Sequence, residues 1–177
     1  MTARRYLAFI TAGLIALTGC AKTASPPVAD VAADEAAIRA INPQWFKAYA
    51  AGDADAIAAL YAEDAVLSPP GAPPARGRAA IREYLAGDVA ASKAAGASFN
   101  PGPSPEFGVS GDLGCEWNTF QVTDSSGATV DTGKYVTVYG RKEGKWAIVR
   151  DIWNSDAAPA AANAEAPEAR TPEAPGD

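Results

Sequence analysis

The stretch from Gly133 to Asp156, GKYVTVYGRKEGKWAIVRDIWNSD, constrains the fold of this chain most strongly. It predicts two strands, Lys134–Lys142 and Lys145–Trp153, joined by a tight turn at Glu143-Gly144. Both arms are rich in β-branched and aromatic residues, which suit a pleated surface. Gly144 can adopt the positive φ that a two-residue turn requires. We therefore expect a β-hairpin near the C-terminal end of the folded part of the chain.

Alternation along the second strand divides its side chains between two faces. One face carries Ala147, Val149, Asp151 and Trp153, and the other carries Trp146, Ile148, Arg150 and Ile152. Asp151 is thus a carboxylate among apolar neighbours. Because loss of hydration raises the pKa of a carboxylic acid, Asp151 is the candidate for a general acid or base. The alternative is that it accepts hydrogen bonds that join the sheet to the helices.

Composition excludes several kinds of site. Histidine is absent from all 177 residues, which removes the commonest general base, the usual serine–histidine triad and the commonest zinc ligand. The formal net charge is −6, so no nucleic-acid partner is predicted. No cofactor and no metal are predicted either. The acidic residues Asp53, Asp55, Glu63 and Asp64 admit a calcium site, but helix caps and solvated surface explain them better.

The first twenty residues have the features of a bacterial lipoprotein signal. Two arginines precede an apolar run from Tyr6 to Leu17, which is too short to span a bilayer. The following Leu17-Thr18-Gly19-Cys20 resembles a lipobox, which implies a signal peptide over residues 1–19 and acylation of Cys20. Buried acyl chains would anchor the protein on the periplasmic side of the bacterial cell envelope, with the outer membrane favoured. An ordinary signal peptide with a chance cysteine is the alternative.

The rest of the chain divides into three parts. Residues 20–33 show no apolar periodicity and are predicted to be a tether. Residues 34–156 form the predicted folded domain. Residues 157–177 are rich in Ala, Pro and Glu, and cannot bury enough apolar surface to offset their ordering entropy, so a disordered tail is predicted.

Within the domain, helical patterns come before the strands. A first helix capped by Asp34 is expected to split near Ala40 because of Pro43, and Asp53 caps a second one that carries Tyr61. A third runs from about Gly77 to Gly96, after which prolines allow only an irregular or edge strand. Residues 112–123 alternate as a strand and lead through a turn to the hairpin. This order predicts an α+β fold, a curved antiparallel sheet with about three helices on its concave face.

Three segments together resemble the nuclear-transport-factor-two-like superfamily, and most closely its SnoaL-like and uncharacterised bacterial domains. They are WFKAYAAGDADAIAALYAEDAVLSPPGAPPARGRAAIREYL, GDLGCEWNTFQVTDSSG and DTGKYVTVYGRKEGKWAIVRDIWNSD, in that order between Asp34 and Asp156. The resemblance implies a cone-shaped domain whose sheet wraps a pocket, and frequent homodimers. Because this fold hosts enzymes, ligand binders and assembly modules, it does not decide the function.

The resemblance also shows which catalytic groups are missing. The best-known enzyme of the superfamily, ketosteroid isomerase, uses an aspartate base with a tyrosine and a protonated aspartate. These roles fall on Ser68, near Trp45 and near Val136 of this chain, and none of the required groups is present. SnoaL and related cyclases use an acid–base pair that usually includes histidine. Relatives often carry arginine at the position of Trp117, so an anchor for an anionic ligand is also lost.

If Asp151 faces the concave side, the predicted pocket is apolar and aromatic with few polar groups, the usual build of a small-molecule site. Its predicted lining residues are Trp45, Tyr49, Tyr61, Ser68, Trp117, Thr119, Val136, Val138, Val149, Asp151 and Trp153. For the tryptophans the alternative is core packing, and for Ser68 it is a turn.

These observations predict a lipid-anchored periplasmic domain that binds a small, mostly apolar molecule or a protein partner, without catalysis. Two alternatives stay open. One is a ketosteroid-isomerase-like or SnoaL-like enzyme that uses Asp151 as its acid or base. The other is a homodimeric interaction module that uses the outer face of the sheet.

Overall fold

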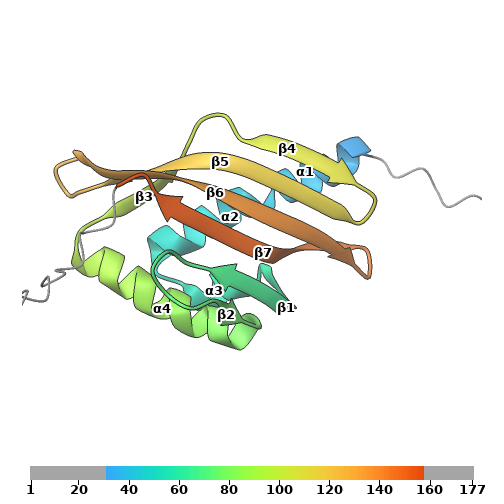
Figure 1. Cartoon of the computed structure of the whole chain (residues 1–177), viewed down its shortest axis with the longest axis horizontal. Coiled ribbons are helices and arrows are strands. Elements are labelled where there is room, and N and C mark those ends of the chain that lie inside the picture. Colours follow the sequence, from blue (N-terminus) through green and yellow to red (C-terminus); the bar gives the residue numbers. More distant parts are fainter. Residues whose placement is uncertain (1–30, 158–177) are drawn as a thin grey trace, which may run out of the picture.

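The computed structural model describes residues 31–157, in which four helices pack against one seven-stranded sheet (Figure 1). The helices are α1 (Val31–Arg39), α2 (Ile41–Ala51), α3 (Ala54–Ala58) and α4 (Arg78–Ala94). The strands are β1 (Tyr61–Ser68), β2 (Ala75–Arg76), β3 (Ser98–Pro101), β4 (Glu106–Ser110), β5 (Leu113–Thr123), β6 (Thr129–Lys142) and β7 (Lys145–Ser155). The predicted α+β class and the curved sheet with helices on one face are confirmed.

Several predictions fall on residues outside this range. They are the signal peptide (1–19), Cys20, the tether up to residue 30 and the tail from residue 158. Between Val31 and Ala157, no helix is long and apolar enough to cross a membrane.

Helix boundaries follow local chemistry. The first helical stretch is interrupted at Ala40, three residues before Pro43, and this break separates α1 from α2. Gly52 ends α2 with a φ of 81°, a left-handed conformation that suits glycine. The side chain of Asp53 then caps α3 by accepting a hydrogen bond from the Ala56 N–H at 2.9 Å.

Asp34 is not the helix cap that its sequence position predicts. It lies inside α1 and is buried, because its carboxylate accepts two hydrogen bonds from the Arg141 guanidinium of β6, at 2.7 and 3.0 Å. The indole N–H of Trp146 in β7 donates a third at 3.1 Å. A bidentate ion pair of this kind fixes the orientation of the two side chains as well as their distance, so it holds α1 against the β6–β7 hairpin.

The sheet has the strand order β2-β1-β7-β6-β5-β3, and β4 also pairs with β5. The expected all-antiparallel sheet is corrected at one place, since β1 and β7 run parallel. On the far edge, β3 pairs with residues 120–123 of β5 and β4 pairs with residues 113–117. Pro101, Pro103 and Pro105 stand at the break between them, because proline cannot donate a hydrogen bond to a neighbouring strand.

The β6–β7 hairpin has the predicted tight turn, with positive φ at both Glu143 (51°) and Gly144 (77°). Beyond the turn, the hairpin departs from regular pairing. Tyr139 pairs with Ile148, but Val138 pairs with Arg150, so Val149 has no partner and forms a β-bulge.

The bulge reverses the alternation of side chains along β7. Ile148 and Asp151 are both buried, at 3% and 8% exposure, although three residues separate them. Val149 turns to the outer face, where its Cγ1 lies 2.9 Å from the position that a Cβ on Gly140 would occupy. Asp151 consequently stands opposite Thr137, and not opposite Val136 as a regular hairpin would place it.

Gly133 allows an aromatic ring to lie flat against the sheet. It is paired with Phe120 of β5 on one side and with Ser155 of β7 on the other. A Cβ at this position would stand 2.2 Å from Phe120 Cζ and 2.3 Å from the carbonyl oxygen of Asn154. Only glycine therefore leaves room for the Phe120 ring, which forms part of the cavity described next.

Candidate functional site

A cavity of about 410 Å³ lies between the concave face of the sheet and helices α2 and α4. Eight of the residues within 31–157 that line it are aromatic. The rings come from Trp45, Phe46 and Tyr49 of α2, Phe99 of β3, Phe120 of β5, Tyr135 and Tyr139 of β6 and Trp153 of β7. Pro70, Ala91 and Ala95 also line the cavity and are exposed, so they mark its opening. This volume is in the range of cavities that hold small molecules.

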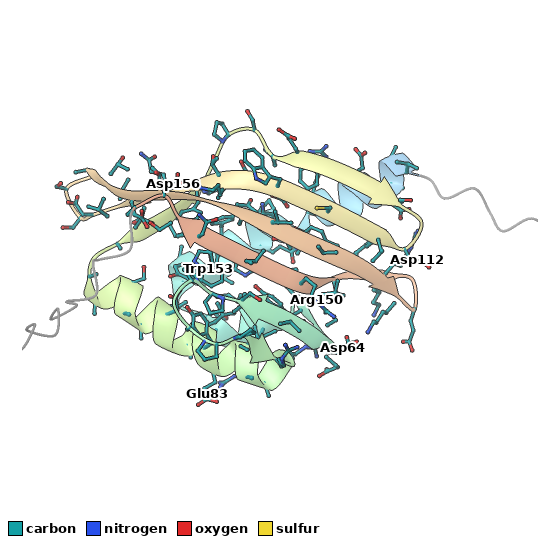
Figure 2. The ribbon with its side chains drawn as sticks, in the orientation of Figure 1. Asp64, Glu83, Asp112, Arg150, Trp153 and Asp156 are labelled. Atoms are coloured by element: carbon teal, nitrogen blue, oxygen red, sulfur yellow. The ribbon has the colours of Figure 1, made fainter. Side chains whose placement is uncertain are left out.

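The rings of the aromatic wall pack against one another. Trp45 and Tyr49 are stacked with ring centroids 5.1 Å apart, and Phe99 and Phe120 are stacked at 4.6 Å. Trp153, labelled on β7 in Figure 2, stands edge-on to Tyr84 of α4 at 6.1 Å. Offset and edge-on pairs of this kind stabilise each other beyond the effect of burial.

Asp151 lines the cavity and is held by two hydroxyl donors. Tyr61 of β1 donates to Oδ2 at 2.6 Å, and Thr137 of β6 donates to Oδ1 at 3.1 Å. The Tyr61 hydroxyl in turn accepts the indole N–H of Trp45 at 3.1 Å. Burial raises the pKa of Asp151 to about 6, and the two hydrogen bonds limit the rise.

A second buried carboxyl group, Glu116 of β5, is fully inaccessible to solvent. Tyr135 donates to its Oε1 at 2.7 Å and Tyr139 donates to its Oε2 at 2.8 Å. The Asn42 amide of α2 donates both to Glu116 and, at 2.8 Å, to the Tyr135 hydroxyl. Burial, and then the carboxyl group of Glu116, raise the pKa of Tyr135 and Tyr139.

The two carboxyl groups belong to one row across the sheet. Glu116 is paired with Thr137, and Thr137 is paired with Asp151, on three adjacent strands. With strands about 4.8 Å apart, the Cα atoms of Glu116 and Asp151 are about 10 Å apart on the same face. The row therefore places two acids behind one cavity, with a threonine between them.

Two further carboxylates line the half-buried part of the cavity. Asp88 of α4 accepts the Tyr49 hydroxyl at 2.7 Å. Asp131 of β6 accepts the Ser155 hydroxyl at 2.7 Å and the Thr132 N–H at 2.8 Å. Burial, followed by Asp88, raises the pKa of Tyr49. Residues 31–157 contain no group of three or more side chains placed to hold a metal ion.

The structure brings four of the predicted pocket residues together. Trp45, Tyr49, Asp151 and Trp153 line the cavity. Tyr61 lies behind Asp151, and it belongs to β1 instead of the predicted second helix. Ser68 is at the end of β1 and does not line the cavity. Whether any of these residues binds a ligand or takes part in catalysis stays a prediction.

Five predicted lining residues lie elsewhere, and this is a correction. Trp117, Thr119, Val136, Val138 and Val149 do not line the cavity. Trp117 is 40% exposed on the outer face, whereas its neighbours Glu116 and Asn118 are buried. A regular hairpin would place Val136 beside Asp151, and the bulge at Val149 moves the register by one residue. This single shift explains why residues of both β5 and β6 were predicted to face the cavity although they lie on the outer face.

The same shift explains four site residues that the sequence analysis missed, which are Glu116, Tyr135, Thr137 and Tyr139. One signal could have found the three on β6, since Tyr135, Thr137 and Tyr139 alternate on one face of this strand. The pairing of this face with Glu116 and Asn118 does not follow from counting outward from the turn after Thr123, because the register shifts between Thr123 and Val122 and leaves Val130 without a pairing partner on β5. The sequence analysis also missed other residues that line the cavity, including Asn42, Phe46, Asp88, Phe99, Phe120 and Asp131.

Comparison with known proteins agrees with this architecture. A family model described as SnoaL-like domain matches residues 43–149. An NTF2-like protein with a cystatin-like fold from Novosphingobium aromaticivorans is 25% identical, with a TM-score of 0.62, and the match covers 68% of this chain and 80% of that one. A search of curated proteins gave no match.

Two further solved structures share the fold. A protein of unknown function from Mycobacterium tuberculosis is 22% identical with a TM-score of 0.62, over 75% of this chain and 78% of that one. A ketosteroid isomerase-like protein from Erwinia carotovora atroseptica is 18% identical with a TM-score of 0.54, over 70% and 96%. At these identities, the likeness shows the fold alone.

The raised pKa of Asp151 makes a prediction about stability. Between about pH 4 and pH 6 the native state binds this proton more tightly than the unfolded chain does, so the free energy of unfolding falls as pH rises through this window. Asp151→Asn lacks the titration. Relative to this variant, the wild type is expected to lose up to about 3 kcal/mol between pH 4 and pH 7. Urea denaturation at several pH values measures the difference.

The exposed Glu106→Gln on β4 is the matched control, and is expected to change stability little. A difference between wild type and Asp151→Asn that stays constant from pH 4 to pH 7 would show that the Asp151 carboxyl group keeps its hydration.

Proposed function

The chain belongs to the SnoaL-like domain family, and we propose that its domain binds a small, mostly apolar molecule in the cavity between the sheet and helices α2 and α4. The observation that carries this proposal is the cavity itself. About 410 Å³ of space remains beside a stacked aromatic wall, and an interior that served only as a core would be close-packed. Rigid rings around preformed space lower the cost of ordering a ligand.

A neutral apolar dye, N-phenyl-1-naphthylamine, tests this proposal with residues 31–157. We expect saturable one-to-one binding, seen as a rise in dye emission. Ala91→Trp places a large ring at the opening of the cavity and should weaken binding at least tenfold. Ala90→Trp is the matched control, because Ala90 is the neighbouring exposed residue of α4 and does not line the cavity. Absence of saturable binding to the wild type would contradict the proposal, as would equal binding by the two variants.

The second candidate is an enzyme that uses Asp151 as its acid or base. The observation in its favour is a cavity-lining carboxyl group whose pKa, at about 6, suits proton transfer near neutral pH. The ketosteroid isomerase-like neighbour shares the fold and indicates proton transfer next to a carbonyl group as the reaction to test. Against this candidate, the tyrosines of the cavity already donate to carboxylates, so they are not free to stabilise an oxyanion.

Isomerisation of a β,γ-unsaturated steroid ketone, followed by the absorbance of its conjugated product, separates the two candidates. Turnover by the wild type that is lost in Asp151→Asn at an unchanged melting temperature supports the enzyme. Turnover absent from the wild type would contradict this candidate for the isomerase reaction.

The third candidate is a homodimer formed through the outer face of the sheet. Large apolar side chains are exposed there on β5 and β7, since Trp117 is 40% exposed and Ile152 is 53% exposed, and the half-buried Val136 of β6 lies between them. These three residues are paired in one row. Contiguous apolar surface of this kind is typical of interfaces. Light scattering of the soluble domain is expected to give a dimer, and Trp117→Glu a monomer; a monomeric wild type would contradict this candidate.

We further propose that Cys20 is acylated and anchors the domain on the periplasmic side of the cell envelope. Of the two membranes, we favour the outer membrane. The support is the sequence alone, an apolar run followed by Leu17-Thr18-Gly19-Cys20. In a bacterial host, the full chain should fractionate with membranes and incorporate labelled palmitate. Cys20→Ser should abolish the label, and Cys115→Ser is the control. Label retained in Cys20→Ser would contradict the anchor.

A further inference from the structure

The hydrogen-bond donors that line the cavity are already in use. The hydroxyls of Tyr135 and Tyr139 donate to Glu116, Thr137 donates to Asp151, and Tyr49 donates to Asp88. Further donors follow the same pattern: Ser155 donates to Asp131, Ser92 to the Ala97 carbonyl, Asn42 to Glu116, and Trp45 to the Tyr61 hydroxyl. Trp153 is the exception, since its indole N–H has no hydrogen bond within residues 31–157. A ligand that offers only acceptors therefore finds few donors.

Acceptors, by contrast, remain available. Both hydrogen bonds to Asp131 fall on Oδ1, and the one to Asp88 falls on Oδ2. One oxygen of each carboxylate thus has no hydrogen-bond partner within residues 31–157. Each carboxylate oxygen can accept more than one hydrogen bond, so both groups can still bind a donor.

The charges around the cavity all have one sign. Asp88, Asp131 and Asp151 line it, and no lysine or arginine of residues 31–157 does. Glu116 lies directly behind Tyr135 and Tyr139. Clefts lined by a single sign of charge concentrate ligands of the opposite sign and repel those of the same sign.

Together, these observations assign a chemical class to the ligand. We propose, building on the binding function above, that the cavity selects an apolar organic cation. The hydrocarbon part of this amine fills the aromatic interior, and its ammonium group is bound by the half-buried carboxylate of Asp88 or Asp131. Asp88 and Ala91 of α4 and the C-cap residue Ala95 recur at helical spacing, which places Asp88 on the face that leads to the opening.

The aromatic wall suits the same ligand. Electron-rich faces of indole, phenol and phenyl rings attract cations that lie within about 6 Å of the ring centre. Trp45, Tyr49 and Trp153 line the same cavity as Asp88 and Asp131. A cation that enters the cavity can contact both carboxylate oxygens and ring faces. An anion would find no positively charged side chain of residues 31–157 lining the cavity and few hydrogen-bond donors that are not already in use.

Three ligands of nearly equal shape test the proposal: 4-phenylbutylamine, 4-phenylbutanol and 4-phenylbutyrate, at pH 7.5 and low ionic strength. Isothermal titration of residues 31–157 measures each dissociation constant. We expect the amine to bind about tenfold more tightly than the alcohol, as one favourable charge contact allows, and the carboxylate to bind most weakly.

Two isosteric variants identify the carboxylate involved. Asp131→Asn keeps an oxygen that can accept from Ser155 and Thr132, and Asp88→Asn keeps one for Tyr49, so each removes charge with little change of shape. At least one of them should reduce amine affinity about tenfold and leave alcohol affinity unchanged. Glu83→Gln is the control for net charge, because Glu83 is on α4 outside the cavity (Figure 2).

The outcomes separate this proposal from the binding function on which it rests. Equal affinities for amine and alcohol, or amine affinity unchanged in both variants, would overturn the cation preference and leave the binding of apolar molecules intact. If none of the three ligands and no neutral dye binds, the binding function itself fails. A loss of amine affinity in Glu83→Gln equal to that in the cavity variants would show long-range attraction by net charge, which also overturns the proposal.

Discussion

Two buried carboxyl groups impose the strongest constraint on the interior of this domain. Glu116 and Asp151 stand in one row on the buried face of the sheet, and within residues 31–157 neither forms an ion pair. Burying such a group costs several kcal/mol unless hydrogen-bond donors replace the lost water. Tyrosine, threonine and asparagine side chains supply those donors from α2, β1 and β6. The donors that hold the acids are therefore the ones that a ligand cannot use, so stability and ligand chemistry have a common origin.

Two local departures from regular β structure make this arrangement possible. The bulge at Val149 brings Ile148 and Asp151 to the same side of β7, which a regular strand would forbid. Gly133 leaves room for Phe120, whose ring would otherwise collide with a side chain on β6. The bulge on β7 and the register shift between β5 and β6 at Val122 and Thr123 set which side chains of these strands face the cavity. Without these departures from regular β structure, strands of the same composition would turn different side chains toward the interior.

The sequence predicts those features that depend on local chemistry. The Glu143-Gly144 turn, the Asp53 cap and the break before Pro43 are each specified by a few adjacent residues. The register beyond the turn is not, because Val149 has the composition of any strand residue and nothing beside it marks a bulge. With Asp151 facing inward and the pairing regular, Trp117 and Val136 become interior residues, and their apolar character supports the error. The parallel pairing of β1 with β7 depends on the path of the whole chain, and no short segment encodes it.

The ion pair between Asp34 and Arg141 fixes where the chain enters the domain. It secures α1 beside the β6–β7 turn, whereas Asp131, ten residues earlier on β6, lines the cavity. At about 3.3 Å per strand residue, some 30 Å separate the two ends, and Figure 1 shows α1 and the C-terminal end of α4 on opposite sides of the molecule. The chain therefore enters the domain at the end opposite to the C-terminal end of α4, where Ala91 and Ala95 line the opening of the cavity.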